Sequence, residues 1–199
     1  MECKGLESVK LGEGIEALGT EEYPNKRFCT SYHGIFEGCA LERVELPSTL
    51  KRIWYKVFFG CGRLRSIKLP EQLEYIGKMS FSKTGLQSIT FPGSVRTVYQ
   101  AAFFDCRSLR TAVLNEGLEV LGCDEYGKGN KAMSGVFEEC ALEEVRLPST
   151  LWRIEYNAFR GCKRPASIRL PERLEYLGLW RFEGTGLESI SIPPMLRTV

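Results

Sequence analysis

A chain of 199 residues with 43% hydrophobic and 26% charged residues has enough apolar material for the core of one or two folded domains. Its 27 basic and 25 acidic residues leave a net charge of +2, so no strong overall field attracts nucleic acid or an anionic membrane. No apolar run approaches the roughly 20 residues that a membrane-spanning helix needs, and the first residues lack the apolar stretch of a signal peptide.

A short unit recurs along the chain from the first residues to the last. It reads approximately C-x-x-L-x-x-I-x-L-P-x-x-L-x-x-I-G-x-x-x-F, and successive copies are 22 or 23 residues apart except where two insertions lengthen the step. Pro165 stands where the seventh of eight copies would have its first leucine. In the other copies the first leucine is Leu6, Leu41, Leu64, Leu86, Leu109, Leu142 and Leu187.

The repeats are grouped in two large blocks that match closely. IFEGCALERVELPSTLKRI from Ile35 and VFEECALEEVRLPSTLWRI from Val136 are 101 residues apart. We therefore predict one domain, 1–199, of about eight repeats, with duplicated blocks at roughly 1–103 and 104–199. Such a unit can bury its apolar face only against its neighbours, so the copies must stack into a coil with one continuous core.

Each copy predicts one turn of this coil. In L-x-x-I-x-L the alternating apolar residues, such as Ile67 and Leu69, point inward from a short strand, and strands of successive turns pair in parallel. The following proline, as at Pro70, cannot donate a ladder hydrogen bond and ends the strand. A second apolar pair, such as Leu73 and Ile76, forms the opposite wall. A phenylalanine then fills the space behind this wall, at Phe58, Phe81, Phe103, Phe159 and Phe182.

This unit resembles the leucine-rich repeats of the BspA-like family over nearly the whole chain. The resemblance depends on the proline after each strand and on the pairs Ala102-Phe103 and Ala158-Phe159 that close a turn. It implies a mainly β, right-handed leucine-rich-repeat solenoid, with a parallel sheet on one face and short strands or irregular 3-10 turns on the other. It also implies a binding role, as in surface or secreted adhesion proteins of bacteria and some protists, and it supplies no catalytic residues.

Six of the eight cysteines share one place in the repeat, shortly before the first leucine, and Thr84 and Thr185 take that place in two other copies. A position that accepts Cys or Thr indicates a small buried side chain that hydrogen-bonds to the backbone. Stacked thiols about 5 Å apart come near disulfide range, but side by side they are poorly directed for bonding, so we predict reduced thiols. The six are Cys3, Cys39, Cys61, Cys106, Cys140 and Cys162. Cys29 and Cys123 lie in the insertions, where either is a candidate free thiol.

The chain offers little for metal or cofactor binding. It has no C-x-x-C pair, and His33 is its only histidine. We therefore expect no metal and no cofactor. The same inventory argues against an enzyme, because no Ser-His-Asp order can be built from regular positions and no carboxylate pair is singled out by spacing.

The two insertions, 19–34 and 122–135, occupy the same place in the two blocks. Both follow Leu-Gly, contain Glu-Tyr and return to an apolar residue followed by Phe, so the duplication carried the loop along. Loops on a rigid frame often carry binding residues. The alternative is that their aromatic side chains pack back onto the coil. Under the binding hypothesis the candidate contacts are Tyr23, Phe28, Tyr32, His33 and Tyr126.

The outward residues of the first strand form a second candidate surface. One such residue lies between the two inward residues of each copy, and this column contains Lys68, Arg146 and Arg169. Arg146 and Arg169 belong to adjacent turns and can pair with an acidic partner; otherwise the column is a solvated face that keeps the sheet soluble. Trp54 and Trp152 follow the strands, and if exposed they would be better anchors than the strand face.

We therefore predict a non-enzymatic protein-binding or adhesion module whose partner is a protein, such as an extracellular-matrix or cell-surface component, with no nucleic acid and no membrane insertion. The alternative is an intracellular interaction scaffold or a structural spacer of a longer repeat protein. A fragment of a longer protein would lie at the cell surface or be secreted, whereas a chain complete as given would be cytoplasmic. Ends without recognisable caps favour end-to-end self-association.

Overall fold

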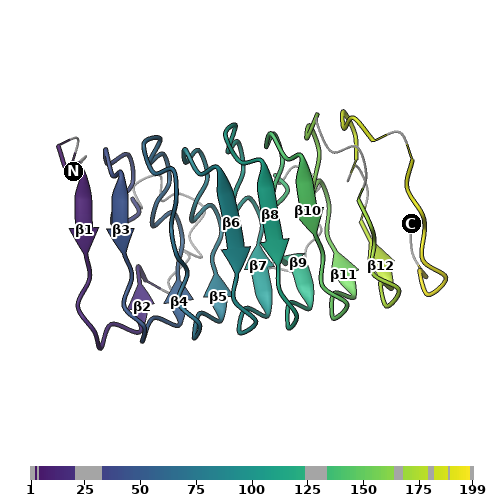
Figure 1. The fold of residues 1–199 in the computed structure, drawn as a ribbon, viewed down its shortest axis with the longest axis horizontal. Coiled ribbons are helices and arrows are strands. Elements are labelled where there is room, and N and C mark those ends of the chain that lie inside the picture. The colour runs from purple at the N-terminus through teal and green to yellow at the C-terminus, as the bar shows by residue number, and fades with distance from the viewer. Residues whose placement is uncertain are drawn as a thin grey trace, which may run out of the picture.

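The chain winds into an elongated coil whose turns follow one another from the N-terminus to the C-terminus (Figure 1). The computed structural model describes residues 3, 5–20, 33–123, 134–163, 168–178, 182–187 and 189–197. These residues contain twelve short β-strands, and every strand pair among them is parallel. The repeat solenoid with parallel strands that the sequence predicts is confirmed.

The second apolar pair of each turn builds the longest sheet of the molecule, which we call the second wall. Equivalent residues pair from turn to turn, so that Leu18 lies beside Ile53 and Ile53 beside Ile76. These inward residues are buried, and a buried face fixes the register of its strands. In order along the coil the strands are β2 (Ala17–Leu18), β4 (Arg52–Ile53), β5 (Tyr75–Ile76), β7 (Thr97–Tyr99), β9 (Val120–Cys123), β11 (Arg153–Ile154) and β12 (Tyr176–Leu177).

The strand before the proline of each turn builds the first wall, which is interrupted at residues 66–69 and, among the described residues, has no strand after residue 146. The sequence predicts a continuous ladder here, but residues 66–69 and 168–171 form no strand. Val44 and Val145, on the strands just before these two segments, are only half-buried. The strands form two sheets, β1 (Ser8–Lys10) with β3 (Arg43–Glu45), and β6 (Ser88–Phe91) with β8 (Thr111–Leu114) and β10 (Glu144–Arg146).

Stacked phenylalanines form the third side of the coil. Neighbouring ring centroids along this ladder are 5.2 to 6.0 Å apart, and the ring planes are nearly parallel. All the rings except Phe182 are buried, so the predicted packing role of the repeat phenylalanine is confirmed. The ladder consists of Phe36, Phe58, Phe81, Phe103, Phe137, Phe159 and Phe182.

Backbone hydrogen bonds also join the phenylalanine turns to one another. The residues two positions before and after Phe58 have positive φ, 53° at Lys56 and 73° at Gly60. Because residues with positive φ alternate with residues of ordinary φ, the peptide N–H groups of this segment all point along the coil toward the next turn. The N–H groups of Lys56, Phe58 and Gly60 donate to the carbonyl oxygens of Lys78, Ser80 and Ser82 on the next turn.

Candidate binding surfaces

Four of the repeat cysteines lie inside the coil and donate their S–H to a backbone carbonyl oxygen of the preceding turn: Cys61, Cys106, Cys140 and Cys162. The Sγ of Cys61 is 3.0 Å from the carbonyl oxygen of Phe36 on the preceding turn, and Cys162 makes the same bond to Phe137 at 3.0 Å. Burial raises the pKa of both thiols to about 12. Thr84 donates instead to Phe81 at 2.8 Å. The predicted role of this position, a small buried side chain bonded to the backbone, is confirmed.

The cysteines described by the structure are not paired with one another. Cys39, Cys61, Cys106, Cys140 and Cys162 are buried free thiols, whereas Cys3 is exposed. Cys29 and the side chain of Cys123 lie outside the described residues.

Among the described residues, no three His, Cys, Asp or Glu side chains gather as metal ligands. Nor does any helix there have the length and apolar character to cross a bilayer.

Matched contacts hold both insertions where they rejoin the coil. A Cβ atom on Gly34 would lie 1.7 Å from the carbonyl oxygen of Lys56, and one on Gly135 would lie 1.8 Å from that of Asn157. Only glycine fits such a close approach of two backbones. The returning chain is therefore pressed against the next turn in both blocks.

A glutamate side chain caps each of these rejoining points. Glu37 accepts the N–H of Gly34 at 2.9 Å, and Glu138 accepts that of Gly135 at 2.7 Å. His33, one of the predicted contacts, is exposed, with its Nδ1 3.2 Å from Oε2 of Glu37. The other predicted insertion contacts, Tyr23, Phe28, Tyr32 and Tyr126, lie outside the described residues.

The predicted contacts of the first wall are exposed, and two of them line one groove. Arg146 of β10 and Arg169 of the next turn border an open cavity of about 450 Å³. Arg173 lies at the same rim, and Val145, Leu147 and Leu170 are also part of the lining. Lys68 is exposed at the equivalent place in the first block, and the structure does not bring it to this groove.

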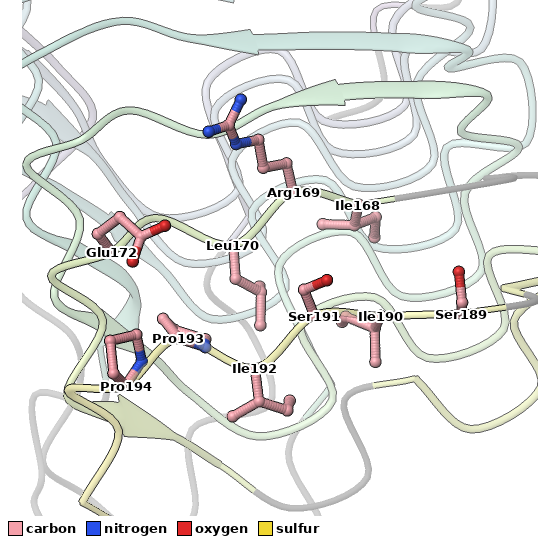
Figure 2. A pocket seen from close by; sticks show the side chains of 10 residues that line it. All are labelled: Ile168, Arg169, Leu170, Glu172, Ser189, Ile190, Ser191, Ile192, Pro193 and Pro194. Atoms are coloured by element: carbon pink, nitrogen blue, oxygen red, sulfur yellow. The ribbon is translucent and has the colours of Figure 1, made fainter.

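A second groove of about 420 Å³ follows between residues 168–172 and 189–194. Figure 2 shows Arg169 pointing to one side of its segment while Ile168 and Leu170 point to the other, as expected for extended chain. Ile192, at the far border of the groove, is 53% exposed. The interrupted part of the first wall thus combines arginine side chains with accessible apolar ones.

The second wall shows a pattern that sequence reasoning missed, in which large residues alternate with glycine from turn to turn. The position in question directly follows the buried strand residue of each turn. Here Trp54 stands between Gly19 of the preceding turn and Gly77 of the next turn. A Cβ on Gly77 would lie 2.8 Å from the backbone carbon of Trp54, so the glycine leaves room for the turn beside it. Superposing the repeats at this one position discloses the alternation, a signal that is absent from any single repeat.

The alternation lets aromatic rings gather on the outside of the second wall. The rings of Trp54 and Tyr75 have centroids 4.4 Å apart, and those of Tyr75 and Tyr99 are 4.6 Å apart. Arg52 and Arg96 join the two tyrosines around a cavity of about 410 Å³. All three rings are half-buried. Tryptophan, tyrosine and arginine are the residues most enriched at the centres of protein interfaces.

The second block carries a related cluster at a different offset. The guanidinium carbon of Arg153 lies 4.3 Å from the ring centroid of Tyr176 and 5.9 Å from that of Trp152. Glu155 stands where the first block has Trp54, and it forms an ion pair with Arg153 at 2.5 Å. Both tryptophans singled out from the sequence and described by the structure are therefore half-buried parts of aromatic and cationic clusters.

Comparison with known proteins connects this architecture to bacterial repeat proteins. A leucine-rich repeat protein from Bacteroides ovatus is 29% identical, with a TM-score of 0.76 over 98% of this chain and 45% of that one. Another, from Eubacterium ventriosum, is 22% identical, with a TM-score of 0.56 over 78% of this chain and 39% of that one, and it shows the fold alone. The chain thus spans less than half the length of either protein.

A search among curated proteins finds no match to the chain. The family described as "BspA type Leucine rich repeat region", however, matches it in six copies that cover residues 30–126 and 130–199. The chain therefore belongs to the BspA type leucine-rich-repeat family, as its repeat unit indicates.

Proposed function

We propose that this chain is a non-enzymatic adhesion module that binds a protein partner through one face of its repeat coil. Leucine-rich repeats of this family generally mediate protein interactions. The observation that carries the proposal is the groove that brings Arg146 and Arg169 together beside Val145, Leu147 and Leu170. Exposed arginines beside partly buried apolar side chains such as Val145 and Leu147 resemble the composition of an interface centre.

The rigid frame supports the same proposal. The second wall and the phenylalanine ladder run through consecutive turns, so side chains on the outside keep fixed distances from one another. A preorganised surface loses little conformational entropy when a partner binds. A rigid repeat coil is therefore suited to recognition.

The aromatic cluster of Trp54, Tyr75 and Tyr99 is a second candidate surface for the same function. Its rings pack against one another at tilted angles and are half-buried, and Arg52 and Arg96 lie at its border. We further propose that the insertions, with Tyr23, Phe28, Tyr32, His33 and Tyr126, and the first-wall residue Lys68 extend the contact area beyond these clusters.

The test is capture of partners by the purified, immobilised chain. Extracellular-matrix proteins and a lysate of the producing cell are offered separately to the wild type and to three variants. The variants are Arg146→Glu with Arg169→Glu, Tyr75→Ala with Tyr99→Ala, and a chain lacking both insertions. Arg63→Glu with Lys163→Glu is the control for charge, because both side chains are exposed outside the two clusters. Thermal unfolding shows which variants keep the fold.

The outcomes separate the alternatives. Capture of a matrix protein that is lost in the Arg146 and Arg169 variant, but kept in the charge control, supports an adhesion module that uses the first wall. Capture from the lysate alone favours an intracellular scaffold, and loss only in another folded variant moves the site to that surface. No capture from either source contradicts the proposal and favours a structural spacer.

A further inference from the structure

We propose that Arg52 binds a carboxylate side chain of a protein partner, in the way that Arg153 binds Glu155 in the second block. This inference rests on the proposed protein-binding function and names the group that the partner presents to the aromatic cluster of the first block. The two blocks place equivalent arginines among different neighbours, and only one of these arginines has a carboxylate of its own chain.

Trp54 and Glu155 occupy the same position on the second wall. Each directly follows the buried residue of its strand. Each also packs against a glycine of the preceding turn, because a Cβ on Gly19 would lie 3.0 Å from the Cβ of Trp54, and one on Gly122 would lie 3.0 Å from the Cβ of Glu155. The backbone therefore accepts either side chain here, and the choice decides what the neighbouring arginine contacts.

In the second block this arginine is engaged within the chain. Arg153 pairs with Glu155 at 2.5 Å, and its guanidinium carbon lies 4.3 Å from the ring centroid of Tyr176. Glu155 is buried, so its carboxylate is held away from water. The pair is an internal example of how this part of the wall binds a carboxylate, with an arginine that also contacts a tyrosine ring.

In the first block the equivalent arginine lacks both contacts. Trp54 replaces the glutamate and packs against Tyr75, with 4.4 Å between the ring centroids. Among the described residues, the side chain of Arg52 forms no ion pair, hydrogen bond or cation–π contact. It is half-buried and borders the cavity of about 410 Å³. A guanidinium that is partly shielded from water and has no carboxylate of its own favours one from outside.

Nearby acidic side chains do not fill this place. Glu74 lines the same cavity, but in the described part of the chain it forms no ion pair with Arg52. Glu16, on the preceding turn, is already paired with Lys51 at 3.1 Å. The carboxylate that Arg52 lacks is therefore not supplied by these neighbours.

The surrounding charge also favours an anionic group. Residues 51–113 contain eleven basic and three acidic residues, whereas the whole chain has a net charge of only +2. Arg96 lines the same cavity, and its guanidinium donates to the carbonyl oxygen of Gly117 at 2.9 Å. The aromatic cluster thus lies in the most basic part of the coil, where the local field attracts carboxylates.

The rings of the cluster indicate what accompanies the carboxylate on the partner. Trp54, Tyr75 and Tyr99 are half-buried, so part of each side chain remains for contact with an apolar group. Tryptophan, tyrosine and arginine together are typical of the centre of a protein interface. A glutamate or aspartate next to an apolar residue therefore matches the site.

The experiment measures binding of short peptides to the full chain by saturation-transfer NMR, which detects weak complexes. The probe is the peptide Gly-Ser-Gly-Glu-Leu-Gly-Ser-Gly with blocked ends, and in two control peptides Gln or Lys replaces Glu. Galacturonic acid, a sugar with a carboxylate, is offered separately. We expect the Glu peptide to bind about tenfold more tightly than either control peptide.

Exchanging the residue beside the arginine should exchange the two sites. Trp54→Glu gives the first block an internal carboxylate, and we expect the Glu peptide to bind about tenfold more weakly because this carboxylate occupies Arg52. Glu155→Trp removes the internal carboxylate of the second block, and we expect a second site to appear at Arg153. Arg52→Gln should weaken binding by about the same factor. The matched control is Arg65→Gln, which removes an exposed arginine of the first wall and should change nothing.

A neutral variant separates the charge from the loss of the ring. Trp54→Gln removes the indole without adding a carboxylate, so it should keep the preference for the Glu peptide over the Gln peptide, whereas Trp54→Glu should lose this preference. Thermal unfolding identifies the variants that keep the fold. Either side chain has room, because glycine stands at this position on both adjacent turns of each block.

Equal binding of the Glu and Gln peptides by the wild type would overturn the inference, as would unchanged binding in the Arg52→Gln variant. Binding of galacturonic acid in place of the peptide would overturn the assignment to a protein carboxylate. The proposed function is tested separately by capture of proteins. If the Arg146→Glu, Arg169→Glu variant loses a captured protein while the wild type shows no preference for the Glu peptide, the inference fails and the binding function stands. A preference for the Glu peptide without capture of any protein supports the Arg52 site and counts against the adhesion role.

Discussion

The hydroxyl group of Ser80 is buried on the phenylalanine side of the coil, without a hydrogen-bond partner among the described residues. The equivalent residues on the adjacent turns, Val57 and Ala102, are apolar and buried. Since an unsatisfied buried hydroxyl is costly, we expect Ser80→Ala to raise the free energy of unfolding by about 1 kcal/mol. Urea unfolding measures this change. In the control Ser82→Ala stability should fall, because the Ser82 hydroxyl donates to the carbonyl oxygen of Ala101 at 2.5 Å. A less stable Ser80→Ala protein would contradict the assignment.

Two glutamate side chains fasten one turn to the next at equivalent places in the blocks. Glu13 accepts the N–H and the hydroxyl of Ser48, and Glu116 does the same with Ser149. These backbone and hydroxyl donors lower the pKa of both carboxyl groups.

A lowered pKa in the folded state makes these contacts sensitive to acid. Their contribution to stability is present above the unfolded pKa of about 4.3 and is lost as the pH falls through the lower folded pKa. We expect the unfolding midpoint of the wild type to fall more steeply below about pH 4.3 than that of a Glu13→Gln, Glu116→Gln variant. Parallel curves of midpoint against pH would show that the carboxylates contribute nothing to stability.

The strands of the second wall depend on glycine where the next turn passes close by. A Cβ on Gly77 would lie 2.8 Å from the backbone carbon of Trp54 and 2.9 Å from the carbonyl oxygen of Ile53. Backbone atoms cannot yield as a side chain would, so we expect Gly77→Ala to destabilise the protein by about 1–3 kcal/mol. The matched control is Gly62→Ala, where a Cβ meets no atom within 4 Å and stability should hardly change. Equal stability of the two variants in urea would refute the role given to Gly77.

Sequence reasoning predicted the strands of the first wall and the buried residues of the second because both recur at fixed offsets, but it left the second wall open between short strands and irregular turns. Ile67, Leu69, Leu73 and Ile76 fall on the expected sides of one turn. The interruption at 66–69 was not predictable, because this segment has the same alternation of apolar residues as the paired strand β3. Whether two strands pair depends on the turns on either side of them, and the sequence of a single repeat does not contain that information.

The candidate surfaces were predictable in part for the same reason. Neighbouring turns in a coil lie side by side, so the repeat spacing placed Arg146 next to Arg169, and the structure brings both to one groove. The cluster of Trp54, Tyr75 and Tyr99 escaped prediction because its rings come from unequal offsets in three turns. Gly77, on the turn that carries Tyr75, leaves room for the backbone of Trp54 on the preceding turn.

The coil as a whole is held by contacts between adjacent turns, so a defect in the middle should matter more than one near an end. Phe103 is fully buried, with ring centroids 5.2 Å from Phe81 and 5.4 Å from Phe137. We expect Phe103→Ala to cost about 3–5 kcal/mol and to lower the urea m-value, because the two halves would no longer unfold as one unit. Phe182→Ala should cost clearly less, since this ring is only half-buried. Similar losses for the two variants would argue against a ladder of neighbour contacts.

The hydrogen bonds of the phenylalanine turns also give the coil an electrical polarity. In the described turns the donor lies on the earlier turn and the acceptor on the later one, from Phe36 N to Val57 O through to Gly161 N to Glu183 O. Peptide dipoles aligned in this way add together, with the positive pole toward the later turns. To continue the same hydrogen bonds, a further turn or a second copy stacked on the positive end would have to present carbonyl oxygens to N–H groups. Growth of the coil through these bonds would therefore be head-to-tail, an arrangement that differs from the two-fold interface of a symmetric dimer.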